Sequence, residues 1–308
     1  MKIERIVVTG RLREVIKQYL SQELYEYKFM AEQEVKEADL SWADAYVGFA
    51  PPQHTSLTGV KWVHSLGAGV DSFLFQKSWN EEVLLTRTIC SFGERIAQYC
   101  LSYILSDLQK HDEFRNQQQQ YQWLPATPLL LHTQTVIVYG TGEIGRELAR
   151  VLSYLGVKVI GLSRSGQMQP YFHEVLPMQR AREVLGRANW IISTLPLTNE
   201  TETMFDINFF QQLKSAGFMN VGRGRTVHEE SLVEALMNGN VRKVVLDVFE
   251  QEPLPQNSQL WHHPNVVVTP HISAVTTPQE AAQCFLKTLR EIEEGKLPTN
   301  IVDPQKGY

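Results

Sequence analysis

A glycine-rich turn between an apolar strand and a helix limits the fold of this chain more than any other feature. The expected strand covers 135–139 (TVIVY), and the next six residues have the spacing G-x-G-x-x-G. Such glycines permit a tight turn, and unpaired N–H groups at a helix start attract a pyrophosphate. An ordinary glycine-rich turn is the alternative, but the strand before and the helix after favour a dinucleotide site. Its expected residues are Gly140, Thr141, Gly142, Glu143, Ile144 and Gly145.

Short apolar runs alternate with helix-length segments on both sides of this turn. Strands are expected at 6–8, 45–49 and 60–66, and then at 157–162, 190–195, 217–221, 244–249 and 266–269. One long helix is expected at 94–114, and a last helix begins after Thr277 and ends before Gly295. This order is typical of parallel sheets covered by helices, and the region after the turn predicts a doubly wound α/β domain.

Length and composition exclude several classes of protein. A chain of 308 residues with 43% apolar and 20% charged residues is expected to fold as two domains. A net charge of -5 gives no global reason to bind nucleic acid. Cys90, Cys100 and Cys284 are odd in number and form no Cys-x-x-Cys pair, which fits a cytoplasmic protein. The N-terminus lacks the apolar run of a signal peptide, and no apolar stretch is long enough for a membrane span.

The end of the second strand after the turn bears on cofactor choice. An NAD enzyme normally places an acidic residue there, where its carboxylate accepts the ribose 2′-hydroxyl. This chain instead has Ser163, Arg164 and Ser165, and a guanidinium flanked by hydroxyls suits a 2′-phosphate. The sequence therefore favours NADP(H) over NAD(H), and a solvated arginine without cofactor contact is the alternative.

Three polar residues follow strands of the same domain, where open α/β sheets gather their ligands. They are Arg223, Glu252 and His271. An arginine can bind a substrate carboxylate and polarise a ketone, a histidine can donate a proton, and a carboxylate can favour the imidazolium. Each residue could instead serve a surface ion pair or a turn, but the set beside a dinucleotide turn indicates carbonyl reduction. No metal is expected, because His262 and His263 lack a metal-binding spacing.

These motifs, together with 66–71 (LGAGVD), resemble those of the D-isomer-specific 2-hydroxyacid dehydrogenases over almost the whole chain. Residues 261–264 (WHHP) and 306–308 (KGY) are most similar to the glyoxylate/hydroxypyruvate reductase subgroup. The resemblance implies an α/β fold of two doubly wound parallel-sheet domains with a cleft between them. A Rossmann-type nucleotide domain at 100–284 would be inserted into a flavodoxin-like substrate domain at 1–99 and 285–308. A homodimer through the nucleotide domain is also implied.

The resemblance also assigns roles to individual residues. His271 would be the acid/base, Glu252 its partner and Arg223 the anchor of the substrate, a small 2-keto or 2-hydroxy acid. Further cofactor contacts would come from Pro196, Thr201, Val221 and Asp247, and substrate contacts from the N–H groups of Ala68, Gly69 and Val70. Phe49 is expected either to wall the substrate pocket or to lie in the core.

Two positions depart from the commonest forms of the family. Gln98 stands in the place of a frequent Glu, and Thr194 in the place of a frequent His. They weaken what the resemblance implies about the 94–114 helix and about the contacts along the edge of the cofactor, but not what it implies about the type of reaction. The same fold acting on phosphoglycerate, formate or phosphite, or a cofactor-sensing corepressor without activity, remains an alternative.

Overall fold

The chain divides into two structural units, one of which contains both ends of the chain. The computed structural model describes residues 1–20, 24–53 and 55–307, so Tyr308 of the C-terminal motif lies outside the described residues. The terminal unit comprises Met1–Phe92, Pro196–Asn199 and Val275–Tyr308, and the central unit comprises Gly93–Leu195 and Glu200–Ala274. No helix within the described ranges is both long enough and apolar enough to cross a membrane.

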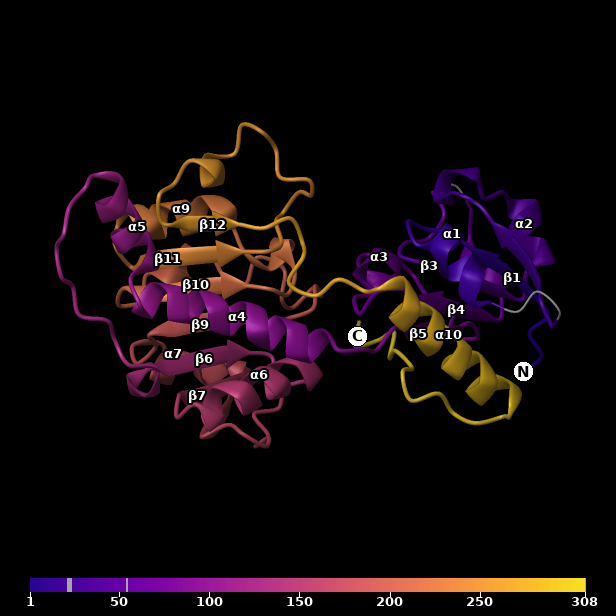
Figure 1. The fold of residues 1–308 in the computed structure, drawn as a ribbon. Coiled ribbons are helices and arrows are strands. Elements are labelled where there is room, and N and C mark those ends of the chain that lie inside the picture. The colour runs from indigo at the N-terminus through magenta and orange to yellow at the C-terminus, as the bar shows by residue number, and fades with distance from the viewer. Residues whose placement is uncertain (21–23, 54, 308) are drawn as a thin grey trace. The chain divides into compact units, whose positions relative to one another are not determined.

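The terminal unit contains a five-stranded parallel sheet in the order β2-β1-β3-β4-β5 (Figure 1). This is the flavodoxin-like order, in which β2 is added on one side of β1 and the later strands are added on the other side. Its strands are β1 (Arg5–Val8), β2 (Glu26–Phe29), β3 (Ala45–Gly48), β4 (Trp62–Ser65) and β5 (Leu84–Arg87). Its helices are α1 (Arg13–Ile16), α2 (Glu37–Trp42), α3 (Asp71–Leu74) and α10 (Pro278–Glu293), with short 3₁₀ turns at Lys17–Tyr19, Glu32–Glu34 and Leu57–Gly59.

The central unit contains a seven-stranded parallel sheet in the order β12-β11-β10-β9-β6-β7-β8. Its strands are β6 (Thr135–Tyr139), β7 (Lys158–Ser163), β8 (Glu174–Pro177), β9 (Trp190–Ser193), β10 (Ala216–Asn220), β11 (Val241–Leu246) and β12 (Val266–Val268). Its helices are α4 (Phe92–Leu108), α5 (His111–Gln119), α6 (Glu143–Tyr154), α7 (Arg182–Leu185), α8 (Ile207–Phe210) and α9 (Glu229–Met237). Short 3₁₀ turns lie at Leu131–Thr133, Met178–Arg180, Gly224–Thr226 and Gln259–Trp261. The prediction of a doubly wound domain here is confirmed.

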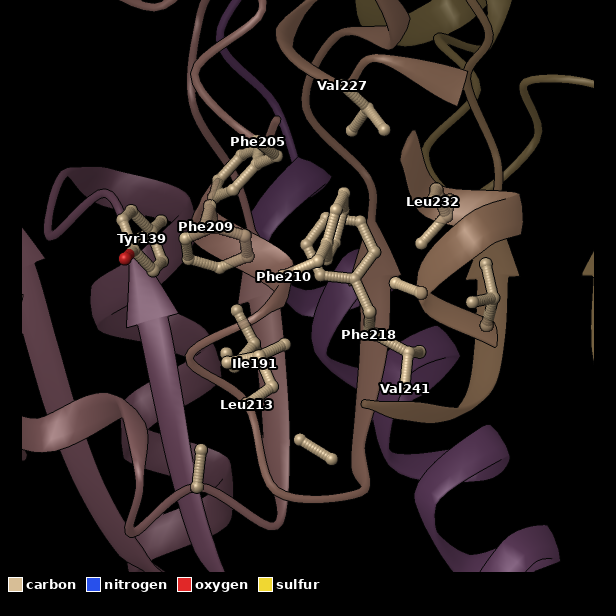
Figure 2. Packing of buried hydrophobic residues seen from close by; sticks show 14 of the residues in the cluster. Tyr139, Ile191, Phe205, Phe209, Phe210, Leu213, Phe218, Val227, Leu232 and Val241 are labelled. Atoms are coloured by element: carbon tan, nitrogen blue, oxygen red, sulfur yellow. The ribbon is translucent and has the colours of Figure 1, made fainter. Parts of the chain in front are cut away.

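Each face of the central sheet has its own apolar core. One core joins the sheet to α4 and α6, through residues such as Cys100, Ile104 and Leu152. The other joins it to α7, α8 and α9 and is rich in aromatic rings. Figure 2 shows several of these rings close together. They meet edge to face, and the ring centroids are 5.0 Å apart for Tyr139 and Phe205 and 4.8 Å apart for Phe205 and Phe209. Burial of large rings on a rigid sheet stabilises the strand ends that carry the polar loops.

The terminal sheet is covered in the same way, with the two chain ends contributing to one core. Phe285 and Leu289 of α10 pack with Ile6, Val47 and Trp62 of the sheet on one face. The prediction that the last helix begins after Thr277 is confirmed, because Thr277 caps α10 and forms a reciprocal capping box with Glu280. The other face packs against α2 and α3.

The expected single helix at 94–114 is wrong. It ends at Leu108, and a separate helix begins at His111 after Lys110, whose φ of 57° is left-handed. The physical reason is burial: α4 rests its apolar stripe on the sheet, whereas α5 has no buried residue. Strands β2, β5 and β8 were not foreseen in the sequence.

A segment with exposed apolar side chains follows α5. Residues 122–130 form no helix or strand, and in Figure 1 this segment runs from α5 along the outside of the central unit. Tyr121 and Trp123 are 98% and 97% exposed, and Leu124, Leu129 and Leu130 are more than half exposed. Large apolar side chains gathered on one exposed segment are typical of an interaction surface.

Candidate active site

A histidine and a glutamate form a close pair at the carboxyl edge of the central sheet. The distance between His271 Nδ1 and Glu252 Oε2 is 2.8 Å. The second oxygen of Glu252 accepts the N–H of Phe249 at 3.1 Å, which fixes the carboxylate. The His271 side chain is 50% exposed, so its other nitrogen is accessible to a ligand. The two residues follow β12 and β11, whose parallel pairing brings their ends together.

The environment keeps Glu252 ionised. Its burial alone would raise the pKa, but the hydrogen bond and charge of His271, the N–H of Phe249 and the charge of Arg223 together hold the pKa below its usual range. The Glu252 carboxylate can therefore accept a hydrogen bond donated by the His271 ring and orient that ring.

Arg223 lies in a tightly held loop after β10. Asn220 donates from Nδ2 to the Arg223 carbonyl at 2.9 Å and accepts the Gly222 N–H at 3.1 Å. The next residue must be glycine, because a Cβ on Gly224 would lie 1.8 Å from the Phe249 carbonyl oxygen. Arg223 acts on the pKa of Glu252, so the expected set of three polar groups shares one edge of the sheet.

The glycine-rich turn has the geometry of a phosphate cradle. Gly140 has a φ of +97°, and α6 begins directly after Gly142. A Cβ on Gly145 would lie 1.8 Å from the Gly140 carbonyl oxygen, whereas a Cβ on Gly142 would meet nothing within 4 Å. The turn is thus packed on its inner side and open on its outer side. Thr194, the departure noted in the sequence, donates to the Tyr139 carbonyl at 3.0 Å and steadies the turn.

The other expected cofactor residues lie in the central unit, apart from one. Ser163 ends β7, the strand paired with β6, and its hydroxyl accepts the Gly166 N–H at 3.1 Å. Arg164 and Ser165 follow as exposed residues. Thr201 and Asp247 are buried, as is Val221, which directly follows β10. The structure groups Pro196 with the terminal unit.

The expected substrate loop of the terminal unit presents backbone donors. Ser65 donates to the carbonyls of Gly67 and Gly69, each at 3.2 Å, and Arg87 donates to the carbonyl of Ala68 at 3.1 Å. With the carbonyls engaged in this way, the N–H groups of Ala68, Gly69 and Val70 can point to a ligand; none of them donates to another group in the described ranges.

Phe49 lies against this loop and is partly exposed. Its ring is 3.5 Å from the position that a Cβ on Gly67 would take, and its carbonyl accepts the Ser72 hydroxyl at 2.8 Å. The Arg11 guanidinium stacks over the ring at 5.0 Å from its centroid. The ring also packs against one core of the terminal unit, so Phe49 is both part of the packing and partly exposed, and its contact with substrate stays a prediction. Within the described residues, no group of three His, Cys, Asp or Glu side chains could hold a metal ion.

The sequence did not reveal the surroundings of Asp247. Its carboxylate accepts hydrogen bonds from the Thr269 hydroxyl at 2.6 Å, from the Ile272 N–H at 2.8 Å and from the Ser273 N–H at 2.9 Å. Asp247 therefore holds the turn that carries His271. No local sequence pattern predicts these hydrogen bonds, because Asp247 is separated from its three partners by 22 or more positions.

Comparison with known proteins points to one family. Residues 101–273 match the family model described as D-isomer specific 2-hydroxyacid dehydrogenase, NAD binding domain. The glyoxylate/hydroxypyruvate reductase A of Salmonella heidelberg is 33% identical over 285 residues, covering 89% of this chain and 91% of that protein. The corresponding protein of an Enterobacter species is 32% identical over 283 residues, covering 89% of this chain and 91% of that protein.

Solved structures resemble the chain over its whole length. A D-isomer specific 2-hydroxyacid dehydrogenase from Xanthobacter autotrophicus in complex with NADPH and MES has a TM-score of 0.89 at 27% identity, with 100% of both chains covered. An NADPH-dependent glyoxylate/hydroxypyruvate reductase from Sinorhizobium meliloti in complex with NADP and sulfate has a TM-score of 0.87, also at 27% identity with 100% of both chains covered.

Proposed function

The chain belongs to the D-isomer specific 2-hydroxyacid dehydrogenases and is an NAD(P)-dependent oxidoreductase, and from this premise we propose that it reduces glyoxylate, hydroxypyruvate or a similar small 2-keto acid to the D-2-hydroxy acid. The observation that carries the proposal is the 2.8 Å pair of His271 and Glu252, on the same sheet edge as the glycine-rich turn. The names of the curated relatives support this substrate class.

In the proposed reaction, each of these groups has its own role. Bound NADPH supplies a hydride for the carbonyl carbon. Because Nδ1 of His271 is engaged by Glu252, the proton for the carbonyl oxygen comes from Nε2. The negative Glu252 favours the imidazolium that can donate this proton. Arg223 binds the substrate carboxylate and polarises the ketone, and the N–H groups of Ala68, Gly69 and Val70 bind a carboxylate oxygen.

Turnover on a panel of substrates tests this proposal. NADPH oxidation is measured with glyoxylate, hydroxypyruvate, pyruvate and bulkier 2-keto acids, and the configuration of every product except the achiral glycolate is assayed by chiral chromatography. We expect the highest kcat/KM with glyoxylate and hydroxypyruvate, whose carbonyl carbons carry a hydrogen and a hydroxymethyl group. If the protein binds NADPH tightly but turns over no 2-keto acid, the proposal of a reductase fails and a cofactor-sensing protein becomes the better explanation.

The proposed cofactor is NADPH rather than NADH. Arg164 follows β7 as an exposed residue beside the phosphate cradle, and the carboxylate that would repel a 2′-phosphate is missing at the end of this strand. The turn itself fits either dinucleotide, because the space outside Gly142 is open. Fluorescence titration with both reduced cofactors is the test, with Arg164→Gln as the variant. We expect NADPH to bind at least about tenfold more tightly and Arg164→Gln to remove most of that difference. Equal affinities of the native protein would rule out the preference.

We also propose a homodimer formed through the central unit. The exposed segment that contains Tyr121 and Trp123 is the supporting feature, since a monomer gains nothing by leaving these rings in water. Light scattering coupled to size exclusion measures the mass, with the double variant Tyr121→Ser, Trp123→Ser as the test. A native mass of about twice 35.3 kDa that falls to one chain in the variant is expected. A monomeric native protein would overturn this proposal.

A further inference from the structure

The turn that carries His271 is a strained piece of backbone. His271 has a φ of 54°, in the left-handed region that residues other than glycine rarely adopt. Its N–H donates to the carbonyls of Asp247 at 2.9 Å and Thr269 at 3.0 Å. The direction of the imidazole therefore depends on what holds the residues on each side of it.

The buried Asp247 carboxylate holds both sides of this turn. One oxygen accepts from the Thr269 hydroxyl, two residues before His271, and also from the N–H of Ile272. The other oxygen accepts from the N–H of Ser273. Hydrogen bonds to a fully buried carboxylate are short and strong, and Asp247 has no exposed surface. These contacts hold the backbone on both sides of His271, and the hydrogen bond to Glu252 holds its ring.

A tyrosine on a different element completes this arrangement. Tyr99 lies on α4, and its hydroxyl is 2.7 Å from the Thr269 hydroxyl. The single hydroxyl proton of Thr269 is directed to Asp247, so Tyr99 is the donor in this bond. Burial raises the pKa of Tyr99 far above its ordinary value, so the phenol keeps its proton at every working pH. The direction of donation is fixed from Tyr99 to Thr269 to Asp247.

We propose that Tyr99 is a positioning residue for His271, acting through Thr269 and Asp247 and orienting the imidazole for proton transfer; this rests on the proposed acid/base role of His271. Each hydrogen bond of the chain polarises the next, so the donor at its start strengthens the grip of Asp247 on the turn. Tyr99 itself touches neither substrate nor cofactor in this proposal. Its hydroxyl raises the fraction of molecules in which the left-handed turn holds the imidazole in the orientation needed for proton transfer.

The central experiment removes one oxygen atom. Tyr99→Phe keeps the ring, which packs against Tyr103 with centroids 4.9 Å apart, and deletes only the donor. We expect kcat to fall by about tenfold, the effect of one lost buried hydrogen bond on a catalytic orientation. The KM for the keto acid and the Kd for NADPH, measured by fluorescence, are expected to change less than about twofold.

Conservative variants of the middle residue test the direction of the chain. Thr269→Ser keeps the hydroxyl and is expected to keep most of kcat, whereas Thr269→Val removes it and is expected to lose at least as much as Tyr99→Phe. The double variant Tyr99→Phe, Thr269→Val is expected to be no worse than Thr269→Val alone, because both changes break the same chain. Additive losses would overturn the proposal.

Tyr46→Phe is the matched control in the terminal unit. The Tyr46 hydroxyl is buried, accepts the Thr9 hydroxyl at 2.9 Å and donates to the Ala50 carbonyl at 2.8 Å, so Tyr46→Phe removes two hydrogen bonds. We expect this variant to lower Tm by at least as much as Tyr99→Phe and to leave kcat unchanged. If Tyr99→Phe behaves in the same way, its hydroxyl is only structural and the proposal fails.

The variant His271→Ala separates the two levels of inference. If His271→Ala retains turnover, the proposed acid/base role is wrong, whatever Tyr99→Phe does. If His271→Ala is inactive and Tyr99→Phe has the native kcat, the reductase proposal stands and the positioning role of Tyr99 is overturned.

Discussion

The two units use the same topology to present different chemistry. In each sheet the order of strand addition reverses beside the first strand of the unit, between β1 and β3 in the terminal unit and between β6 and β9 in the central unit. In each, a glycine with positive φ follows that first strand, Gly10 at 84° and Gly140 at 97°. After Gly140 comes a twelve-residue helix, whereas the turn after Gly10 leads into a helix of four residues. In the described part of the chain, only the first strand of the central unit is therefore followed by a turn into a long helix, whose N-terminus can attract a pyrophosphate.

The polar groups at the two sheet edges also differ in kind. The central unit presents the ionisable side chains of Arg223, Glu252 and His271. Asn220 holds the Arg223 backbone, the Phe249 N–H holds the Glu252 carboxylate, and Glu252 holds the His271 ring. The terminal unit presents backbone N–H groups on a loop held by Ser65 and Arg87. Charged side chains suit proton transfer, and backbone groups suit binding of an anion that does not change. The comparison predicts that changes in the central unit lower kcat or cofactor affinity, and that changes in the terminal unit raise the substrate KM.

The largest expected effect is the loss of the proton donor. His271→Ala is expected to lower kcat by about 10²–10⁴-fold, the usual contribution of a general acid, while NADPH binds as before. Stopped-flow turnover and fluorescence titration measure the two quantities. His111→Ala, an exposed histidine on α5, is the matched control and is expected to be fully active. Retention of more than about a tenth of the native kcat in His271→Ala would contradict the role.

The sequence predicted the local features of the central unit well. The glycine spacing, β6 and the order of Arg223, Glu252 and His271 are carried by short runs of residues, and the structure confirms the strand and helix around the turn. The features it missed depend on distant contacts. The hydroxyls of Tyr99 and Thr269 meet across 170 positions, and Lys110 breaks a pattern that is helical on both sides. Tertiary packing decides such features, and periodicity alone does not record it.

A second comparison is available within the phosphate turn. Gly142→Ala adds a methyl group where nothing lies within 4 Å, so Tm is expected to stay unchanged. A pyrophosphate placed in that space would meet the methyl, and the Kd for NADPH is expected to rise by at least about tenfold. Gly145→Ala instead meets the Gly140 carbonyl oxygen at 1.8 Å and is expected to lower both Tm and affinity. Native affinity in Gly142→Ala would place the pyrophosphate elsewhere.

Stability at acidic pH is expected to separate the units through His64. Its ring is fully buried in the terminal unit, 2.8 Å from the Thr86 hydroxyl, and burial lowers its pKa to about 3. In the unfolded chain the pKa is about 6.5. The unfolded state therefore binds the extra proton, so stability is complete above pH 6.5 and falls by about 1.4 kcal/mol per pH unit as pH falls towards 3.

Hydrogen exchange between pH 7.5 and 5 checks this expectation, after correction for the intrinsic exchange rates. Protection is expected to fall in the strands of the terminal unit more than in the central unit, whose described histidines are all at least partly exposed. His64→Gln is the control, because it cannot bind a proton and is expected to flatten the dependence. An equal fall of protection in both units would show that His64 does not set the acid limit.

The smallest expected effect compares two buried serines, each of which ends a strand. Ser65 ends β4 and holds the carbonyls of the proposed carboxylate loop, whereas Ser193 ends β9 and its buried hydroxyl has no partner within the described residues. Ser65→Ala loosens the loop by about one hydrogen bond, or about 1 kcal/mol, and is expected to raise the KM for the keto acid by about fivefold with unchanged NADPH affinity. Ser193→Ala, measured by the same steady-state kinetics, is expected to leave that KM unchanged. Because both changes remove one buried hydroxyl, a KM effect of equal size in the two variants would mean that loss of volume, and not the held carbonyls, accounts for it. A KM change confined to Ser65→Ala would instead assign anion binding to the backbone of the terminal unit.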